Sequence, residues 1–417
     1  MDTNSQPIEQ LLNDLEDQKL PKLDPLASSK PKRPSFFKKY RTSLIIIIAL
    51  LVILISTLIF FLTNRQSAPE QQAHIDQQTP PPPAKIYSLI SGEEITDSNL
   101  NQKPTYCVQV PNGLDGARPQ VGLHEAKVVF EAIAEAGITR FAAVFQDPKS
   151  SVIGPIRSLR TYYLDWDTPF NCTLVHAGGS YEAIQEARKY RDLTESATFM
   201  WRGNGYWAGR NFVGYYPPNN LFTSANLLQQ FNQKHNYHTS TVNGFARMKP
   251  EEAVENLTAI KEDTTQTFAL AKNIQIKFGH APSFNPTYTY QPETNRYLRA
   301  YADGSPHLSH SCAPELNRPA PQKDCGTATQ LQPQVVIVMK VDEWLDSDRY
   351  HHVIKTISSG EATIFQNGIA LSATWKKTNR EAQIEFFDQN QNPIKLVPGQ
   401  VWVSAIPKDG GSLSYQP

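Results

Sequence analysis

The chain has 417 residues, and its 40 Lys and Arg residues balance 40 Asp and Glu residues, so the formal net charge is zero. A neutral chain of this length has room for two or three domains and gives no electrostatic reason to expect binding to nucleic acid. The sequence therefore predicts no nucleic-acid partner, and the informative signals are local.

The first strong signal is an apolar stretch from Leu44 to Leu62 without a charged residue. A helix needs about 20 apolar residues to cross a hydrocarbon core of roughly 30 Å, so we expect a single transmembrane helix over 43–63. Only Arg65 follows closely, whereas six basic residues precede the stretch: Lys30, Lys32, Arg33, Lys38, Lys39 and Arg41. The positive-inside rule then places the N-terminus in the cytoplasm and the C-terminal parts outside the cell membrane.

The segments on either side of this helix are polar. We expect residues 1–42 to be a disordered cytoplasmic tail, a short helix that docks on a partner being the alternative. Residues 64–84 form a Gln- and Pro-rich spacer with four consecutive prolines. Such a run is extended and semi-rigid, so it would hold the folded part away from the membrane.

All four cysteines follow the anchor, and an even number in an extracytoplasmic region suggests disulfides. We favour a Cys312–Cys325 bridge, because these two residues flank a Pro-rich loop. Cys107 and Cys172 are a second candidate pair, with two buried free thiols as the alternative.

No metal or cofactor is expected. Zinc sites usually show clustered Cys and His spacings, which the cysteines of this chain lack. Asp303, His307 and His310 lie close together in a predicted hairpin loop, but their spacing is not specific for a metal.

Residues 85–240 predict an α+β part, because strands and helices mix there without a regular βαβ repeat. A helix should begin after Ser180, which is suited to cap it, and another should open with TYYLDW. The predicted strands are 105–110, 172–177 and a hairpin of 128–133 with 138–145 that turns at 135–137.

The character of the sequence changes near residue 240. Residues 241–269 predict a linker with a helix, and residues 270–412 predict a second, mostly β part. Within it, the residues Glu293 to Asn295 are a candidate hairpin turn between TYTYQP and RYLRAY.

Several ordered motifs resemble one known family: GLHEAKVVFEAIAEAGITRFAAVF, IGPIRSLRTYYLDW, HAGGS and PPNNLFTS, then YTYQPETNRYLRAYADGSPH, QPQVVIVM and FFDQNQNPIKLVPGQVWVSAIP. They are similar to YerB-like bacterial envelope proteins, a domain of unknown function with N- and C-terminal parts. The resemblance covers about residues 86–408. It implies an extracytoplasmic protein but no established reaction.

This chain departs from that family in two places. Family members are commonly lipoproteins, but no cysteine precedes Cys107, so a transmembrane anchor would replace the lipid. The family also tends to have His-Asn before its last N-terminal motif, where this chain has Asn219 and Asn220. A mechanism that needs a histidine at position 219 is therefore in doubt.

The motif IGPIRSLRTYYLDW contains two arginines, Arg157 and Arg160, on either side of Ser158 and Leu159. A guanidinium suits carboxylate or phosphate groups, so one hypothesis is an anion pocket of Arg157, Ser158 and Arg160. The alternative is that the arginines pair with carboxylates of the protein itself: Glu131, Glu135, Asp165 or Asp167.

The motif HAGGS places His176, Gly178, Gly179 and Ser180 between a strand and a helix. Glycines let a ligand approach the backbone closely, and His176 could act as an acid, a base or a hydrogen-bonding group. A plain tight turn with a buried histidine is the alternative. The motif lacks a complete phosphate-loop signature.

A Gly-rich aromatic segment, residues 199–220, is the third candidate. Its aromatic faces suit sugar rings or a protein partner, unless they are buried against the core. From it we include Trp201, Arg202, Trp207, Arg210 and Asn220 among the possible ligand-binding residues.

The sequence therefore predicts a membrane-anchored envelope protein that binds an anionic or glycan cell-wall ligand, or a cell-wall assembly protein. The alternative is a hydrolase or transferase that acts on an envelope sugar or phosphodiester. In that case His176 would be the acid or base, and the arginines would stabilise developing negative charge. The residue pattern does not decide whether the protein is an enzyme.

Overall fold

The structure is a computed structural model that describes residues 41–63, 84–188, 218–265, 268–311 and 327–417. The chain divides into two units, Met1–Pro81 and Pro82–Pro417.

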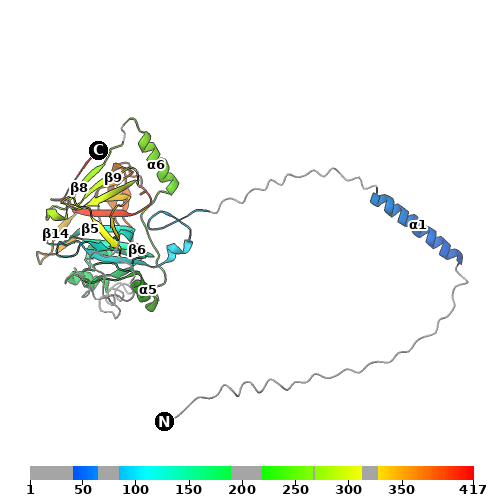
Figure 1. Cartoon of the computed structure of the whole chain (residues 1–417), viewed down its shortest axis with the longest axis horizontal. Helices are drawn as coiled ribbons and strands as arrows, with labels where there is room; N and C mark the ends of the chain where they lie inside the picture. Colours follow the sequence, from blue (N-terminus) through cyan, green and yellow to red (C-terminus); the bar gives the residue numbers. More distant parts are fainter. Residues whose placement is uncertain (1–40, 64–83, 189–217, 266–267, 312–326) are drawn as a thin grey trace, which may run out of the picture. The chain divides into compact units, whose positions relative to one another are not determined.

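The first unit contains helix α1 (Arg41–Thr63), which covers the apolar stretch (Figure 1). Side chains in α1 are described from Ile48 to Phe60 and at positions 62 and 63, and they are exposed. Among the described residues, no helix has the length and apolar character that a membrane crossing needs. The anchor expected over 43–63 stays a prediction, and residues 1–40 and 64–83 lie outside the described residues.

The second unit is built on a nine-stranded sheet in the order β18-β17-β16-β13-β19-β5-β6-β3-β7. Its strands are β3 (Thr105–Pro111), β5 (Val128–Glu135), β6 (Ile138–Gln146), β7 (Thr173–Val175), β13 (Val335–Val341), β16 (Ser359–Gln366), β17 (Ile369–Lys376), β18 (Glu385–Phe387) and β19 (Val401–Pro407). Strand β19 lies between β13 and β5 and is parallel to both. The parts 85–240 and 270–412 therefore contribute to the same sheet.

The described part of the second unit contains four smaller sheets as well. One has the order β10-β9-β8-β20, with β8 (Asn273–Lys277), β9 (Thr287–Gln291), β10 (Arg296–Ala300) and β20 (Ser412–Gln416). Another has the order β12-β11-β4, with β4 (Gln120–Val121), β11 (Leu308–Ser311) and β12 (Thr327–Gln330). The last two are pairs: β1 (Ile86–Tyr87) with β2 (Glu94–Ile95), and β14 (Glu343–Leu345) with β15 (His352–Ile354).

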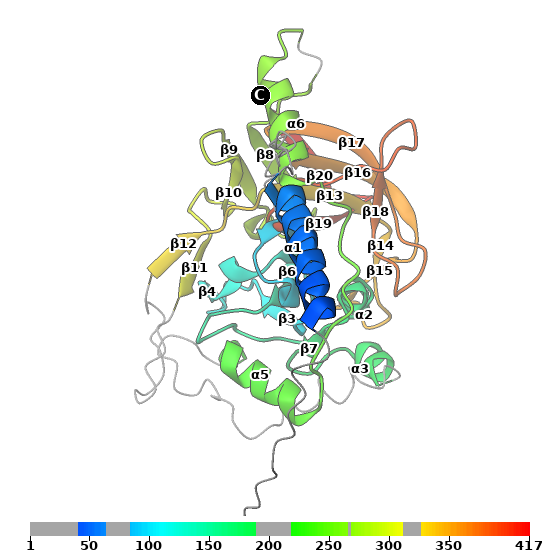
Figure 2. The same cartoon turned by 90° about the vertical axis from the view of Figure 1, so that its right-hand side faces the viewer.

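Within the described residues, the second unit has four α-helices of 7 to 13 residues: α2 (Thr161–Asp167), α3 (Tyr181–Ala187), α5 (Ala225–Lys234) and α6 (Pro250–Glu262). The described 3₁₀ turns are η1 (Ser98–Gln102), η2 (Leu123–Glu125), η3 (Thr168–Phe170) and η5 (Pro282–Phe284). Helices α2, α3 and α5 lie near the β3–β7 end of the sheet, whereas α6 lies near its other end (Figure 2).

Both faces of the central strands are covered, which explains why their sequences are almost continuously apolar. In β5, Val128 and Phe130 pack in one hydrophobic cluster with Tyr162 and Trp166 of α2. Val129 faces the opposite cluster, which includes residues of β8, β9 and β10. The main sheet is thus a shared core layer, with helices α2, α3 and α6 on one side and helix α5 and the four-stranded sheet on the other.

The α+β class and the β-rich C-terminal part are confirmed. Strands β5 and β6 form the predicted hairpin, and β9 and β10 form the hairpin around Glu293 to Asn295. The β5–β6 turn requires positive φ at Ala136 and Gly137, 49° and 78°, which a glycine at the second position makes easier. Helix α3 begins where predicted, with the Ser180 Oγ accepting from the Ala183 N–H at 3.3 Å.

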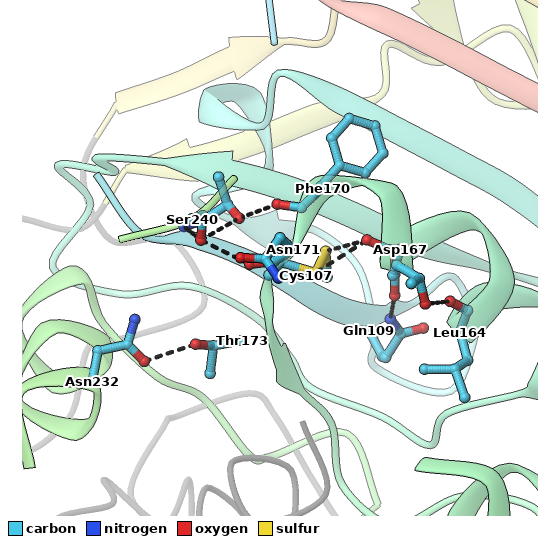
Figure 3. The surroundings of a disulfide bond; sticks show 12 residues. Cys107, Gln109, Leu164, Asp167, Phe170, Asn171, Thr173, Asn232 and Ser240 are labelled. Carbon is cyan, nitrogen blue, oxygen red and sulfur yellow. Dashed lines mark hydrogen bonds between the residues drawn. A yellow bond between two sulfur atoms is a disulfide. The ribbon is translucent and has the colours of Figure 1, made fainter. Parts of the chain in front are cut away.

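A Cys107–Cys172 disulfide joins β3 to the residue before β7 and confirms that pair (Figure 3). The two Cα atoms are 5.7 Å apart, and both cysteines are buried. Cys312 and Cys325 lie outside the described residues. The bridge therefore links the two strands at this edge of the sheet.

Candidate functional site

Backbone hydrogen bonds hold the two candidate segments, 157–160 and 176–180, side by side. The N–H of Ala177 donates to the Arg157 carbonyl at 3.0 Å, and the N–H of Leu159 donates to the Gly178 carbonyl at 2.9 Å. The Arg157 N–H also donates to the Gln109 carbonyl of β3 at 2.8 Å. The structure therefore brings the arginine motif and the HAGGS motif together, as one extension of the β3–β7 edge.

A third segment, 218–221, reaches the same place. The Ile156 N–H donates to the Leu221 carbonyl at 2.7 Å, and the Arg157 Nη1 lies 3.5 Å from the Pro218 carbonyl. Asn220, between these two contacts, is half-buried. We call Arg157, Ser158, His176, Gly178 and Asn220 the Arg157 site.

His176 has a defined tautomer in this arrangement. Its side chain is buried, and its Nδ1 lies 2.6 Å from the Gly178 carbonyl oxygen. Because a carbonyl can only accept, Nδ1 must carry the proton, and Nε2 is then an acceptor. Nε2 has no hydrogen-bond partner in the part of the chain that the structure describes. Burial lowers the pKa of His176 to about 4, so the imidazole is neutral near pH 7.

This buried imidazole should make stability depend on pH. Between its folded pKa of about 4 and an unfolded value of about 6.5, only the unfolded chain binds the proton. Stability should therefore be full above about pH 6.5 and should fall by roughly 2–3 kcal/mol toward pH 4.5. Urea unfolding of wild type and His176→Asn at pH 7 and pH 4.5 measures this, and the variant should lose most of that difference.

The exposed His238 provides the control for this measurement. A His238→Asn variant should keep the pH dependence of the wild type. If His176→Asn also keeps it, the neutral buried state assigned to His176 is wrong.

Arg160 forms an internal ion pair with Glu135. It is buried, and its Nη2 lies 2.6 Å from Oε2 of Glu135, which also accepts from Arg140. Burial raises the pKa of Glu135, but Arg140, Arg160 and Arg157 lower it more, so the net direction is downward. The alternative that the arginines pair with carboxylates of the protein itself is therefore correct for Arg160, whose partner is Glu135.

Arg157 differs from Arg160. It is only half-buried, its Nε is buried without a hydrogen-bond partner among the described residues, and it forms no ion pair with any of them. Arg140 and Arg160 thus share the carboxylate of Glu135, and Arg157 does not contact it. The other candidate carboxylates have partners elsewhere: Glu131 contacts Arg299, Asp165 contacts Arg380, and Asp167 accepts from Gln109.

The small residues of the site have distinct roles. The hydroxyl of Ser158 donates to the Ala177 carbonyl at 3.2 Å, and Ser180 caps α3, so both serines support the backbone. Gly178 has a φ of 72°, and a Cβ there would point into open space. At Gly179 a Cβ would lie 2.9 Å from the Leu159 carbonyl oxygen. The backbone is therefore accessible beside Gly178 and closely packed at Gly179.

Residues 199–217 of the aromatic segment lie outside the described residues. They include Trp201, Arg202, Trp207 and Arg210. The described chain ends at Arg188 and resumes at Pro218, next to the Arg157 site.

A second polar cluster lies buried between the two halves of the sequence. The Arg299 guanidinium lies 3.0 Å from Glu131 Oε1, and its Nε lies 2.9 Å from His307 Nδ1. Glu131 also accepts from the Trp402 indole N–H at 3.1 Å. His307 contacts Gln120 through its other nitrogen at 2.9 Å, so it belongs to this network and forms no group with Asp303 or His310.

Comparison with known proteins finds one family. Residues 90–238 match the N-terminal domain, and residues 274–403 the C-terminal domain, described as protein of unknown function (DUF3048). The putative lipoprotein YerB of Bacillus subtilis (strain 168) is 24% identical over 326 residues, 76% of this chain and 86% of YerB. A crystal structure of YerB protein from Bacillus subtilis aligns with a TM-score of 0.60 at 23% identity, covering 79% of this chain and 100% of that chain. The structural likeness shows a shared fold.

Proposed function

The chain belongs to the DUF3048 family of proteins of unknown function. We propose that this member is a membrane-anchored envelope protein. We further propose that its Arg157 site binds an anionic, glycan-containing cell-wall ligand.

Two features support the envelope location. The similar protein YerB is described as a putative lipoprotein, which is a protein held at a membrane surface by its N-terminus. In this chain the uncharged segment Leu44 to Leu62 lies within the 23-residue helix α1. A single-pass anchor with the second unit outside the cell would give the same placement.

The observation that carries the ligand proposal is the pair formed by Arg157 and His176. Arg157 is a cation without a carboxylate partner among the described residues, and His176 offers a buried neutral acceptor on the adjacent segment. A guanidinium selects carboxylate or phosphate, and a neutral imidazole nitrogen accepts a hydrogen bond from a hydroxyl. Acidic polysaccharides and sugar-phosphate polymers present both groups on one chain.

The low pKa of His176 argues against the hydrolase or transferase alternative. A general base works best when its pKa lies near the working pH, and burial lowers the pKa of His176 to about 4. The imidazole is therefore suited to accept a hydrogen bond more than to remove a proton. A cell-wall assembly protein is the second candidate partner, and the aromatic segment 199–220 would add contact surface for it; residues 199–217 of that segment lie outside the described residues.

Sedimentation with isolated bacterial cell walls tests this function. The full chain in detergent micelles should sediment with intact walls and be released as the salt concentration rises, because its cationic contact is screened. Walls from which acid extraction has removed the anionic polymers should retain at least about tenfold less protein. Equal binding to extracted and intact walls would contradict an anionic ligand.

A further inference from the structure

Three residues far apart in the sequence meet beside the β5–β6 turn. His280 follows β8, Glu343 begins β14, and His352 begins β15. Strands β14 and β15 are antiparallel neighbours, which brings Glu343 and His352 together. His280 lies against the turn, since a Cβ added to Gly137 would be 2.8 Å from the His280 Cβ.

Their side chains converge on one point. One candidate ligand atom from each residue lies within 4.8 Å of the other two. The His280 Nε2 is 4.0 Å from Glu343 Oε2, and the His352 Nδ1 contacts Glu343 Oε1. The two imidazole rings meet edge to face, with centroids 5.2 Å apart.

Burial makes this cluster unusual. The side chain of Glu343 is 5% exposed and that of His352 is 2% exposed. Among the described residues, no Lys or Arg forms an ion pair with Glu343, whose ion-pair partners are the two histidines. A buried carboxylate is costly unless a positive charge compensates it. A divalent cation bound by all three side chains would supply that positive charge.

The ligand types select among cations. Ca²⁺ and Mg²⁺ prefer sites made of oxygen atoms, whereas two imidazoles and one carboxylate are a common set for Zn²⁺. In a tetrahedral zinc centre with bonds of about 2.0–2.1 Å, ligand atoms lie about 3.3 Å apart. The His280 side chain is 46% exposed, so it is free to close the remaining distance to Glu343.

We propose that His280, Glu343 and His352 form a zinc-binding site, with the exposed side of His280 leaving the fourth coordination position to water or to a ligand group. Three protein ligands and one open position are the arrangement that lets zinc polarise a bound molecule. This site is separate from the Arg157 site and does not depend on the function proposed for it.

Isothermal titration of the full chain in detergent micelles with Zn²⁺ tests the site, with metal first removed by a chelator and the disulfides kept oxidised. We expect one Zn²⁺ per chain, no comparable binding of Mg²⁺, and a Zn²⁺-dependent rise in melting temperature. His280→Ala should weaken binding by at least about tenfold and abolish the rise, because it removes one ligand. Because the His280 side chain is 46% exposed, its replacement should leave the fold intact.

The neighbouring His351 gives the matched control. His351 contacts Asp348 and is outside the group, so His351→Ala should bind Zn²⁺ like the wild type. Glu343→Gln, which keeps the side-chain volume, should behave like His280→Ala. The proposal is overturned if the wild type takes up no stoichiometric Zn²⁺, or if His280→Ala and Glu343→Gln bind it as tightly as the wild type.

Discussion

Replacing Arg299 with methionine should lower the free energy of unfolding by about 3–5 kcal/mol. Arg299 is fully buried, and its guanidinium contacts Glu131, His307 and Tyr288. Methionine fills similar volume but leaves the Glu131 carboxylate buried without its cation. Because Glu131 belongs to β5 and Arg299 to β10, this contact joins the two halves of the sequence.

Urea unfolding followed by tryptophan fluorescence measures the effect, and two variants serve as controls. Arg296→Met changes a half-buried arginine on the same strand, whose side chain contacts the Gln332 carbonyl at 3.5 Å, and should cost less than about 1 kcal/mol. Glu131→Gln combined with Arg299→Met removes both charges and should recover part of the loss. Equal stability of Arg296→Met and Arg299→Met would show that the buried ion pair contributes nothing specific.

Removing the Cys107–Cys172 disulfide should cost about 4 kcal/mol. The two cysteines are separated by 65 positions, and closing a loop of that size restricts the unfolded chain by about this free energy in the chain-entropy model. A Cys107→Ser, Cys172→Ser variant should therefore unfold at clearly lower urea concentration than the oxidised wild type, with a similar dependence on urea.

Reduction of the wild type separates the bond from the side-chain change. When both proteins are reduced, wild type and the double serine variant should be similar in stability, and the variant should be slightly less stable because it buries two serine hydroxyls. Peptide mapping without reduction should recover Cys107 and Cys172 in one linked peptide pair. An unchanged midpoint on reduction would contradict a stabilising role for this bond.

Local patterns in the sequence predicted the local elements well. Turn residues between two strand-like runs marked the β5–β6 and β9–β10 hairpins, and Ser180 marked the start of α3, because each signal lies within a few neighbouring residues. The shared sheet could not be predicted in this way. Strand β19 pairs with β5 across most of the chain, and the sequence carries no local sign of such a long-range pairing.

The candidate site shows the same limit. The motifs identified Arg157 and His176 as residues of interest, and the structure places their segments side by side. Nothing local distinguished Arg160 from Arg157, because the difference depends on where Glu135 lies in space. His280, Glu343 and His352 were missed for a similar reason: no short spacing connects them, and only the β14–β15 pairing and the β5–β6 turn bring them together.

The most direct test of the proposed function is the dissociation constant of the full chain for a purified anionic wall polymer, measured for wild type, Arg157→Lys and Arg349→Lys. Lysine keeps the charge but loses the forked geometry, so Arg157→Lys should bind at least about tenfold more weakly while unfolding like the wild type. Arg349 is exposed, away from the Arg157 site in sequence, and its replacement should leave the dissociation constant unchanged. Equal affinity of Arg157→Lys and wild type, or an equal loss in Arg349→Lys, would contradict a specific site at Arg157.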